Sequence, residues 1–153
     1  IPLKIIFPEK KFVLLDSLGK RIKFLNAVVD NLRLDQIELI HGRAEELARD
    51  KQYRESFDIC VSRAVSRLSV LSEYCLPFIR KGGWLVAYKG PDADNEIADA
   101  KNALGVLGGK VMEISDTDMQ KFDVSHRIVY IQKTMNTPKV YPRKAGTPEK
   151  KPL

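Results

Sequence analysis

Short apolar runs alternate with longer segments of helical period along most of this chain. The runs are rich in β-branched and aromatic residues, which predicts buried strands at 11–16, 37–40, 57–62 and 84–88. Elsewhere apolar residues recur every three or four positions, which predicts helices at about 18–32, 43–49, 68–79 and 93–104. This alternation is typical of a parallel sheet with helices on both faces.

The last part of the pattern departs from this alternation. Residues 110–114 and 127–132 both resemble strands, whereas 115–126 between them has no helical period. Two strands without a crossover helix are expected to pair antiparallel, because a parallel return needs a longer connection. A mostly parallel sheet that ends in an antiparallel hairpin is the pattern of the class I S-adenosylmethionine-dependent methyltransferase fold, a Rossmann-like α/β fold. A plain nicotinamide-binding Rossmann domain would end in another parallel strand.

Length and composition fit one globular domain, with 153 residues and an apolar fraction of 44%. No apolar run approaches the roughly 18 residues that a membrane span needs, and no secretory signal opens the chain. Cys60 and Cys75 lie in apolar segments without a metal-ligand spacing, so we expect packed, reduced thiols and no metal. We therefore expect a cytoplasmic protein, and a monomer.

Positive charge and proline are concentrated at the end of the chain. The net charge is +6, and residues 133–153 hold +5 of it, with six lysines and arginines against one glutamate. Four prolines lie in 136–153, which is therefore not expected to form a regular element. We divide the chain into a domain at 1–135 and a basic arm at 136–153 that lies on the surface or reaches to a partner. The charge alone leaves open a polyanionic partner and a solubilising tail.

The predicted strands end in polar or charged groups, namely Asp16, the segment 41–45, Arg63 and Lys89. Ligands of open α/β sheets bind beyond the carboxyl ends of the strands, so these groups are expected to share one site. Asp16 stands where such folds place an acid that accepts hydrogen bonds from both hydroxyls of a ribose. The alternative is a helix cap, since a helix follows closely.

The other strand ends also have two interpretations each. Arg63 closes an apolar strand, where a guanidinium needs an anion; a cofactor carboxylate, an RNA phosphate or an internal salt bridge would serve. Lys89 could contact a phosphate or be a solvated strand end. Ala44-Glu45 follows the loop that lies over the adenine in methyltransferases, although a loop acid is also a common partner of the helix dipole.

Five stretches together resemble the small-subunit ribosomal RNA methyltransferase G family, also called glucose-inhibited division protein B. They are VLLDSLGKRIKFL (13–25), GRAEEL (42–47), FDICVSRAVSRLSVLSEYCLP (57–77), KGGxLxAxKG (81–90, where x marks positions outside the resemblance) and NTPKVYPRKAGTPEKKPL (136–153). The tail motif YPRKAGTP is the most specific of them, and the resemblance covers essentially the whole chain.

The resemblance implies methyl transfer from S-adenosylmethionine to N7 of one guanosine in 16S ribosomal RNA. It implies that Ala44, Glu45 and Arg63 contact the cofactor, and Asp16 is similar to the ribose-binding acid of the wider superfamily. Family members carry a helical region and a glycine-rich turn, GxGxGFPG, before the segment that matches residues 1–3. We therefore expect this chain to lack the first strand and glycine loop of its domain, as part of a longer protein or a cleaved piece.

The chemistry agrees with the absence of acid–base machinery. Guanine N7 has a lone pair and no proton to lose, so the transfer needs alignment rather than a general base. His41 and His126 have no nucleophile at a suggestive spacing. We expect Arg143 and Lys144, with Lys89, to contact phosphates of 16S ribosomal RNA in the small ribosomal subunit. The alternatives are a non-catalytic RNA-binding fragment and a methyltransferase with another substrate.

Overall fold

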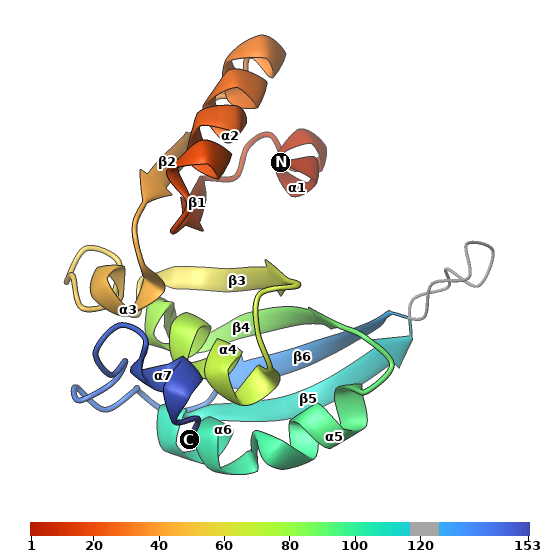
Figure 1. Cartoon of the computed structure of the whole chain (residues 1–153). Coiled ribbons are helices and arrows are strands. Elements are labelled where there is room, and N and C mark those ends of the chain that lie inside the picture. Colours follow the sequence, from red (N-terminus) through yellow and green to blue (C-terminus); the bar gives the residue numbers. More distant parts are fainter. Residues whose placement is uncertain (117–125) are drawn as a thin grey trace. The chain divides into compact units, whose positions relative to one another are not determined.

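The computed structural model describes residues 1–116 and 126–153, and the chain forms two compact units, Ile1–Ala44 and Glu45–Leu153 (Figure 1). In chain order the helices and strands are α1 (Pro2–Ile6), β1 (Phe12–Asp16), α2 (Gly19–Leu32), β2 (Ile37–His41), α3 (Ala44–Leu47), β3 (Phe57–Arg63), α4 (Leu68–Cys75), the 3-10 helix η1 (Leu76–Phe78), β4 (Ile79–Lys89), α5 (Ala93–Asp99), α6 (Lys101–Leu107), β5 (Gly109–Asp116), β6 (Arg127–Lys133) and α7 (Thr147–Lys150). All six predicted strands are present.

The first unit is a parallel strand pair with one long helix. β1 and β2 pair in parallel along their whole length, and their last residues, Asp16 and His41, are partners in the register. α2 packs on both strands and buries Ile22 and Val29. This confirms the centre of the predicted apolar face, whereas Leu32 at its end stays 50% exposed.

The second unit contains a four-stranded sheet in the order β3-β4-β6-β5. β3 pairs with β4 in parallel, while β6 is antiparallel to both of its neighbours, β4 and β5. The predicted antiparallel pairing of the last two strands is therefore confirmed. The segment between them, for which no helix was predicted, lies at 117–125 outside the described residues.

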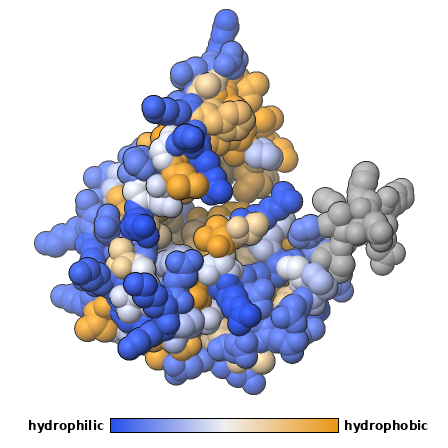
Figure 2. Space-filling model, in the orientation of Figure 1, coloured by the Kyte–Doolittle hydropathy of each residue, from blue (hydrophilic) through white to orange (hydrophobic). Residues whose placement is uncertain are grey.

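The core of the second unit lies on one face of this sheet. α4, α5 and α6 gather on that face (Figure 1), where Leu85 and Ala87 of β4 and Ile131 of β6 are fully buried. On the opposite face, Ile59 and Val61 of β3 are 56% and 42% exposed. No helix in the described part of the chain is long and apolar enough to cross a membrane, and the surface seen in Figure 2 is mostly hydrophilic.

One predicted helix boundary is wrong. The helix predicted at 68–79 ends at Cys75, and a 3-10 turn follows before the chain enters β4 at Ile79. Pro77 explains the early end, because proline lacks an N–H and its ring collides with the carbonyl four residues earlier. Residues 80–83 form the first part of β4, where a Cβ on Gly83 would lie 2.5 Å from the Asp58 carbonyl oxygen. Glycine permits this close approach of two backbones.

A second predicted helix is divided. Residues 93–104 were expected to form one helix, but α5 ends at Asp99 and α6 runs from Lys101 to Leu107. Ala100 between them has φ −84° and ψ −1°, the conformation of a tight turn rather than of a continuous helix. Gly108 caps α6 directly after Leu107 and adopts φ 81°, a left-handed conformation that glycine tolerates best.

Candidate functional site

Asp16 ends β1 in the first unit with its carboxylate close to the start of the next helix. Oδ1 accepts a hydrogen bond from the backbone N–H of Leu18 at 2.8 Å, and Oδ2 pairs with Nη1 of Arg21 at 3.2 Å. Asp16 is not the helix cap considered from the sequence, because the N-cap residue of α2 is Leu18; the bond from the Leu18 N–H closes a turn just before the helix. An ionised carboxylate has about four acceptor positions, so these two donors leave room for a diol.

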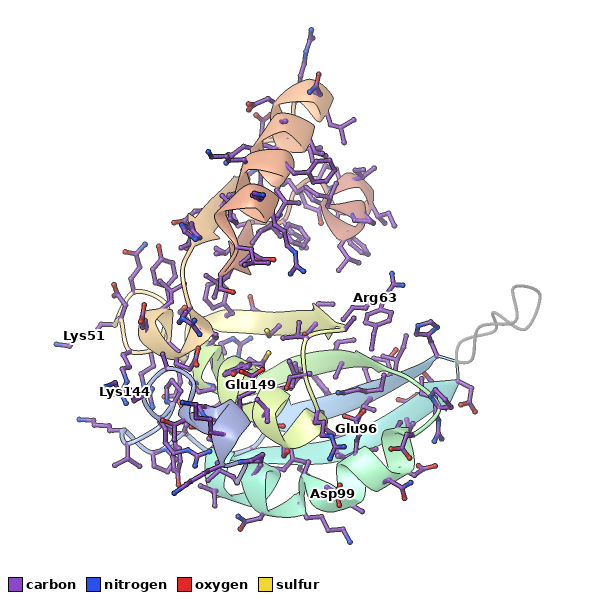
Figure 3. The ribbon with its side chains drawn as sticks, viewed as in Figure 1. Lys51, Arg63, Glu96, Asp99, Lys144 and Glu149 are labelled. Carbon is purple, nitrogen blue, oxygen red and sulfur yellow. The ribbon has the colours of Figure 1, made fainter. Side chains whose placement is uncertain are left out.

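Arg63 and Lys89 end the two parallel strands of the second unit. Arg63 pairs with Tyr88 in the register of β3 and β4, so Lys89 lies one residue further along the neighbouring strand. The structure thus brings both residues to the same edge of the sheet. Arg63 is exposed (Figure 3), and no carboxylate among residues 1–116 and 126–153 lies within 4.0 Å of its guanidinium. The internal salt bridge considered from the sequence is therefore absent from the described part of the chain.

The residue after Arg63 adopts a conformation that sequence analysis did not anticipate. Ala64 has φ 54°, in the left-handed region that costs a non-glycine residue roughly 1–2 kcal/mol. It turns the chain sharply between β3 and α4. Backbone strain of this kind gathers at functional sites, but alanine gives no sequence signal for it.

Lys89 is buried rather than solvated, with 6% of its surface exposed. Its Nζ donates to the Ser66 carbonyl oxygen and to Oε2 of Glu96, both at 2.6 Å. The same Oε2 accepts the backbone N–H of Leu68 at 2.8 Å. Lys89 and Glu96 therefore fix the loop that follows Arg63, and this geometry favours a structural role for Lys89 over the predicted phosphate contact.

A cavity of about 470 Å³ opens beside this ion pair. Four of its lining residues are charged, one basic and three acidic: Arg67, Asp92, Glu96 and Asp99. Glu96 and Asp99 both come from α5 (Figure 3). No group of three or more His, Cys, Asp or Glu side chains in the described ranges is arranged to hold a metal ion.

Ala44 and Glu45 begin α3, directly after the loop that leaves β2. Ala44 is half-buried, whereas Glu45 is 4% exposed and its Oε1 accepts the backbone N–H of Gly146 at 2.9 Å. Glu45 therefore binds a segment 101 residues away in sequence, in addition to lying in the first turn of a helix.

The predicted arm folds back onto the second unit. Arg54 donates to the carbonyl oxygens of Tyr141 and Thr137, each at 2.8 Å, and Arg49 donates to that of Pro142 at 2.6 Å. One helical turn, α7, interrupts a segment for which no regular element was predicted. Proline has no backbone N–H, so this proline-rich segment has fewer backbone donors to pair with its own carbonyl groups. Those carbonyl groups accept hydrogen bonds from arginine side chains instead.

The two predicted RNA contacts in this segment have different surroundings. Arg143 forms a bidentate ion pair with Glu73 of α4, with the shortest N–O distance 2.6 Å, and its backbone N–H donates to Glu73 Oε1 at 2.7 Å. Glu73 is fully buried, so Arg143 neutralises a charge in the interior. Lys144 is exposed (Figure 3), and it remains the better candidate for a phosphate contact.

A buried lysine lies where the segment begins. Lys133 has no exposed surface; its Nζ donates to Thr137 Oγ1 and, at 2.6 Å, to the Leu76 carbonyl oxygen. Removal from water lowers the pKa of Lys133 to about 8, although Glu55 at 3.5 Å acts in the opposite direction. Sequence analysis missed these internal anchors; an acid such as Glu73 within an apolar helical pattern was the available signal.

A family model and curated relatives give the same family for this chain. Residues 1–124 match the family model described as rRNA small subunit methyltransferase G. The whole chain is similar to Ribosomal RNA small subunit methyltransferase G from Clostridium tetani at 52% identity and from Lactobacillus johnsonii at 50%. The chain spans 64% of the length of each of these relatives.

Solved structures of more distant proteins share the fold. An rRNA methylase from Streptococcus thermophilus has a TM-score of 0.59 at 17% identity, covering 82% of this chain and 74% of its own. Fibrillarin from Aeropyrum pernix, in complex with natively bound S-adenosyl-L-methionine, has a TM-score of 0.59 at 17% identity, covering 79% of this chain and 55% of its own. These likenesses confirm the predicted class I S-adenosylmethionine-dependent methyltransferase fold.

Proposed function

Because this chain belongs to the ribosomal RNA small subunit methyltransferase G family, we propose that the protein containing it transfers a methyl group from S-adenosylmethionine to N7 of a guanosine in 16S ribosomal RNA. The observation that carries this proposal is the sequence identity of 52% and 50% over all 153 residues with two relatives of that name. The protein would act as a cytoplasmic monomer on the small ribosomal subunit.

The residues at the strand ends fit the chemical groups of the cofactor. Asp16 has acceptor positions for the ribose hydroxyls, the backbone of Ala44-Glu45 would lie over the adenine, and exposed Arg63 would pair with a carboxylate. When bound, the cofactor supplies an electrophilic methyl group on a sulfonium. The protein needs no general base, because guanine N7 loses no proton; its contribution is to hold the two reactants in line.

Removal of the Arg63 guanidinium tests the cofactor site. In the full-length protein, Arg63→Ala is expected to weaken binding of S-adenosylhomocysteine by about tenfold or more, since a hydrogen bond to a charged group contributes about 1.5–3 kcal/mol. Calorimetric titration measures this affinity. Arg80→Ala is the matched control, because Arg80 is also an exposed arginine at a strand but pairs with Asp58 at 2.7 Å. An unchanged affinity in Arg63→Ala would remove Arg63 from the site.

The activity itself is tested by methyl transfer from labelled S-adenosylmethionine to 16S ribosomal RNA and to the small subunit. Labelled N7-methylguanosine in the digested RNA supports the proposal. RNA affinity without cofactor binding would instead identify an RNA-binding module. Cofactor binding without transfer to RNA would point to another substrate.

Charge reversal at Lys144 tests the RNA surface. Lys144→Glu in the full-length protein is expected to weaken 16S RNA binding and to make the slope of log affinity against log salt less steep by about one, the loss of one phosphate contact. Filter binding at several salt concentrations measures both quantities. Lys101→Glu on α6, an exposed lysine outside the basic segment, is the control. Equal slopes for Lys144→Glu and wild type would exclude the contact.

A further inference from the structure

Glu45 is a buried carboxylate whose partner comes from the other end of the chain. Only 4% of its surface is exposed, and a buried polar group is costly unless it is hydrogen-bonded. Its Oε1 accepts the backbone N–H of Gly146 at 2.9 Å. The position of this side chain, and of the helix start that carries it, is therefore coupled to the position of Gly146.

Gly146 belongs to a turn that is fastened to the second unit. On one side, Arg143 binds buried Glu73 through its backbone N–H and its guanidinium. Within the turn, Thr147 N–H donates to the Lys144 carbonyl oxygen at 2.9 Å. Gly146 itself adopts φ 79°, which glycine tolerates and other residues rarely do. The turn thus holds its N–H donor in a defined place.

The structure assigns the turn 143–146 a positioning role: by holding the Glu45 carboxylate, it fixes the backbone of Ala44-Glu45 for contact with the adenine. This inference rests on the proposed function. Because the Glu45 side chain is 4% exposed and is held by Gly146, its contact with the cofactor is assigned to its backbone groups. The exposed Lys144 lies in the same turn, so one short segment joins the proposed RNA surface to the proposed cofactor loop.

Replacement of the amide bond between residues 145 and 146 by an ester removes the Gly146 N–H and changes little else in the chain. The protein up to Lys144 is ligated to a peptide that completes the chain, with the substitution Ala145→Cys for the ligation and glycolic acid in place of Gly146. The reference is the same ligated protein with ordinary Gly146, so that the two differ by one N–H. We expect the ester to raise the Kd for S-adenosylhomocysteine by about fivefold or more, since the lost hydrogen bond is to a charged acceptor.

A pair of side-chain variants tests the same contact from the other partner. Glu45→Ala removes the acceptor and is expected to raise the KM for S-adenosylmethionine, with kcat at saturation and the KM for RNA close to wild type. Glu45→Gln keeps an oxygen that can accept from Gly146, so it is expected to recover most of the loss. Thermal melts of all variants identify any that fail to fold. If a Glu45 variant fails to fold, the cofactor Kd of the ester protein tests the positioning role alone.

The outcomes separate this inference from the proposed function. A raised cofactor Kd in the ester protein with unchanged RNA affinity supports the positioning role. An unchanged cofactor Kd in the folded ester protein, or Glu45→Gln as impaired as Glu45→Ala, would overturn it while leaving the methyltransferase proposal in place. Failure of the reference protein to bind S-adenosylhomocysteine would overturn the proposed function and this inference with it.

Discussion

Replacement of Arg143 by alanine is expected to lower the free energy of unfolding by about 3–5 kcal/mol, because it leaves a buried charge without its partner. Glu73 is fully buried in α4, and Arg143 Nη2 lies 2.6 Å from Glu73 Oε2. The hydrogen bond with Glu73 raises the pKa of Arg143, so the guanidinium remains charged at neutral pH. Alanine retains the backbone N–H that binds Glu73 but supplies no cation.

Urea denaturation of Arg143→Ala measures this effect, and Lys144→Ala is the matched control. Lys144 is the adjacent residue and is exposed, so its truncation is expected to change stability by less than about 0.5 kcal/mol. Glu73→Gln keeps an acceptor oxygen without a charge, so its loss of stability should lie between those of Arg143→Ala and Lys144→Ala. If Arg143→Ala unfolds at the same urea concentration as Lys144→Ala, the ion pair does not stabilise the protein.

This pair of neighbours shows the limit of charge reasoning from the sequence. Arg143 and Lys144 share a basic motif, and the pattern predicts the same RNA contact for both. The structure distinguishes them through Glu73, which is 70 residues away from Arg143 in sequence. A partner that distant cannot be identified from local charge, and the one available signal, the acid Glu73 inside the apolar pattern at 68–79, was missed.

The fold was predictable where local pattern and tertiary packing agree. The strands were found because their apolar runs are short and bounded, and the antiparallel pairing of β5 with β6 followed from the lack of a crossover helix. The errors lie where one residue changes the backbone. Pro77 ended a helix whose apolar period continued to Ile79, and the period also continued through the turn at Ala100.

The candidate site was predictable in outline because strand ends follow from strand positions. The sequence located Arg63 and Lys89 at one edge of a sheet, and the register confirms that placement. Their surroundings were not predictable, since Lys89 binds Glu96 in the interior while Arg63 remains exposed. Burial depends on which loops and helices cover the edge, and neither residue's own sequence context contains that information.

Replacement of Gly108 by alanine is expected to destabilise the protein by about 2–5 kcal/mol. Gly108 adopts φ 81° at the end of α6, and a Cβ there would lie 2.3 Å from the carbonyl oxygen of Met135. The left-handed conformation costs alanine roughly 1–2 kcal/mol, and displacement of a packed backbone adds about 1–3 kcal/mol. The displaced atoms belong to backbone rather than to a flexible side chain, so little relaxation is available.

Gly82→Ala separates the two contributions. Gly82 has a similar φ of 86°, but its nearest neighbour is the flexible Arg80 Nη1 at 3.9 Å, so alanine there should cost only the conformational part. Urea denaturation of both variants gives their losses of stability, and the difference between the two losses is the cost of the contact between the new Cβ at position 108 and the Met135 backbone. Met135 leads into Thr137, which binds Lys133 and Glu55, so Gly108→Ala should also speed hydrogen exchange at the Thr137 amide. Equal losses in both variants, with Thr137 still protected, would mean that the chain yields at Met135 without disturbing the segment that follows.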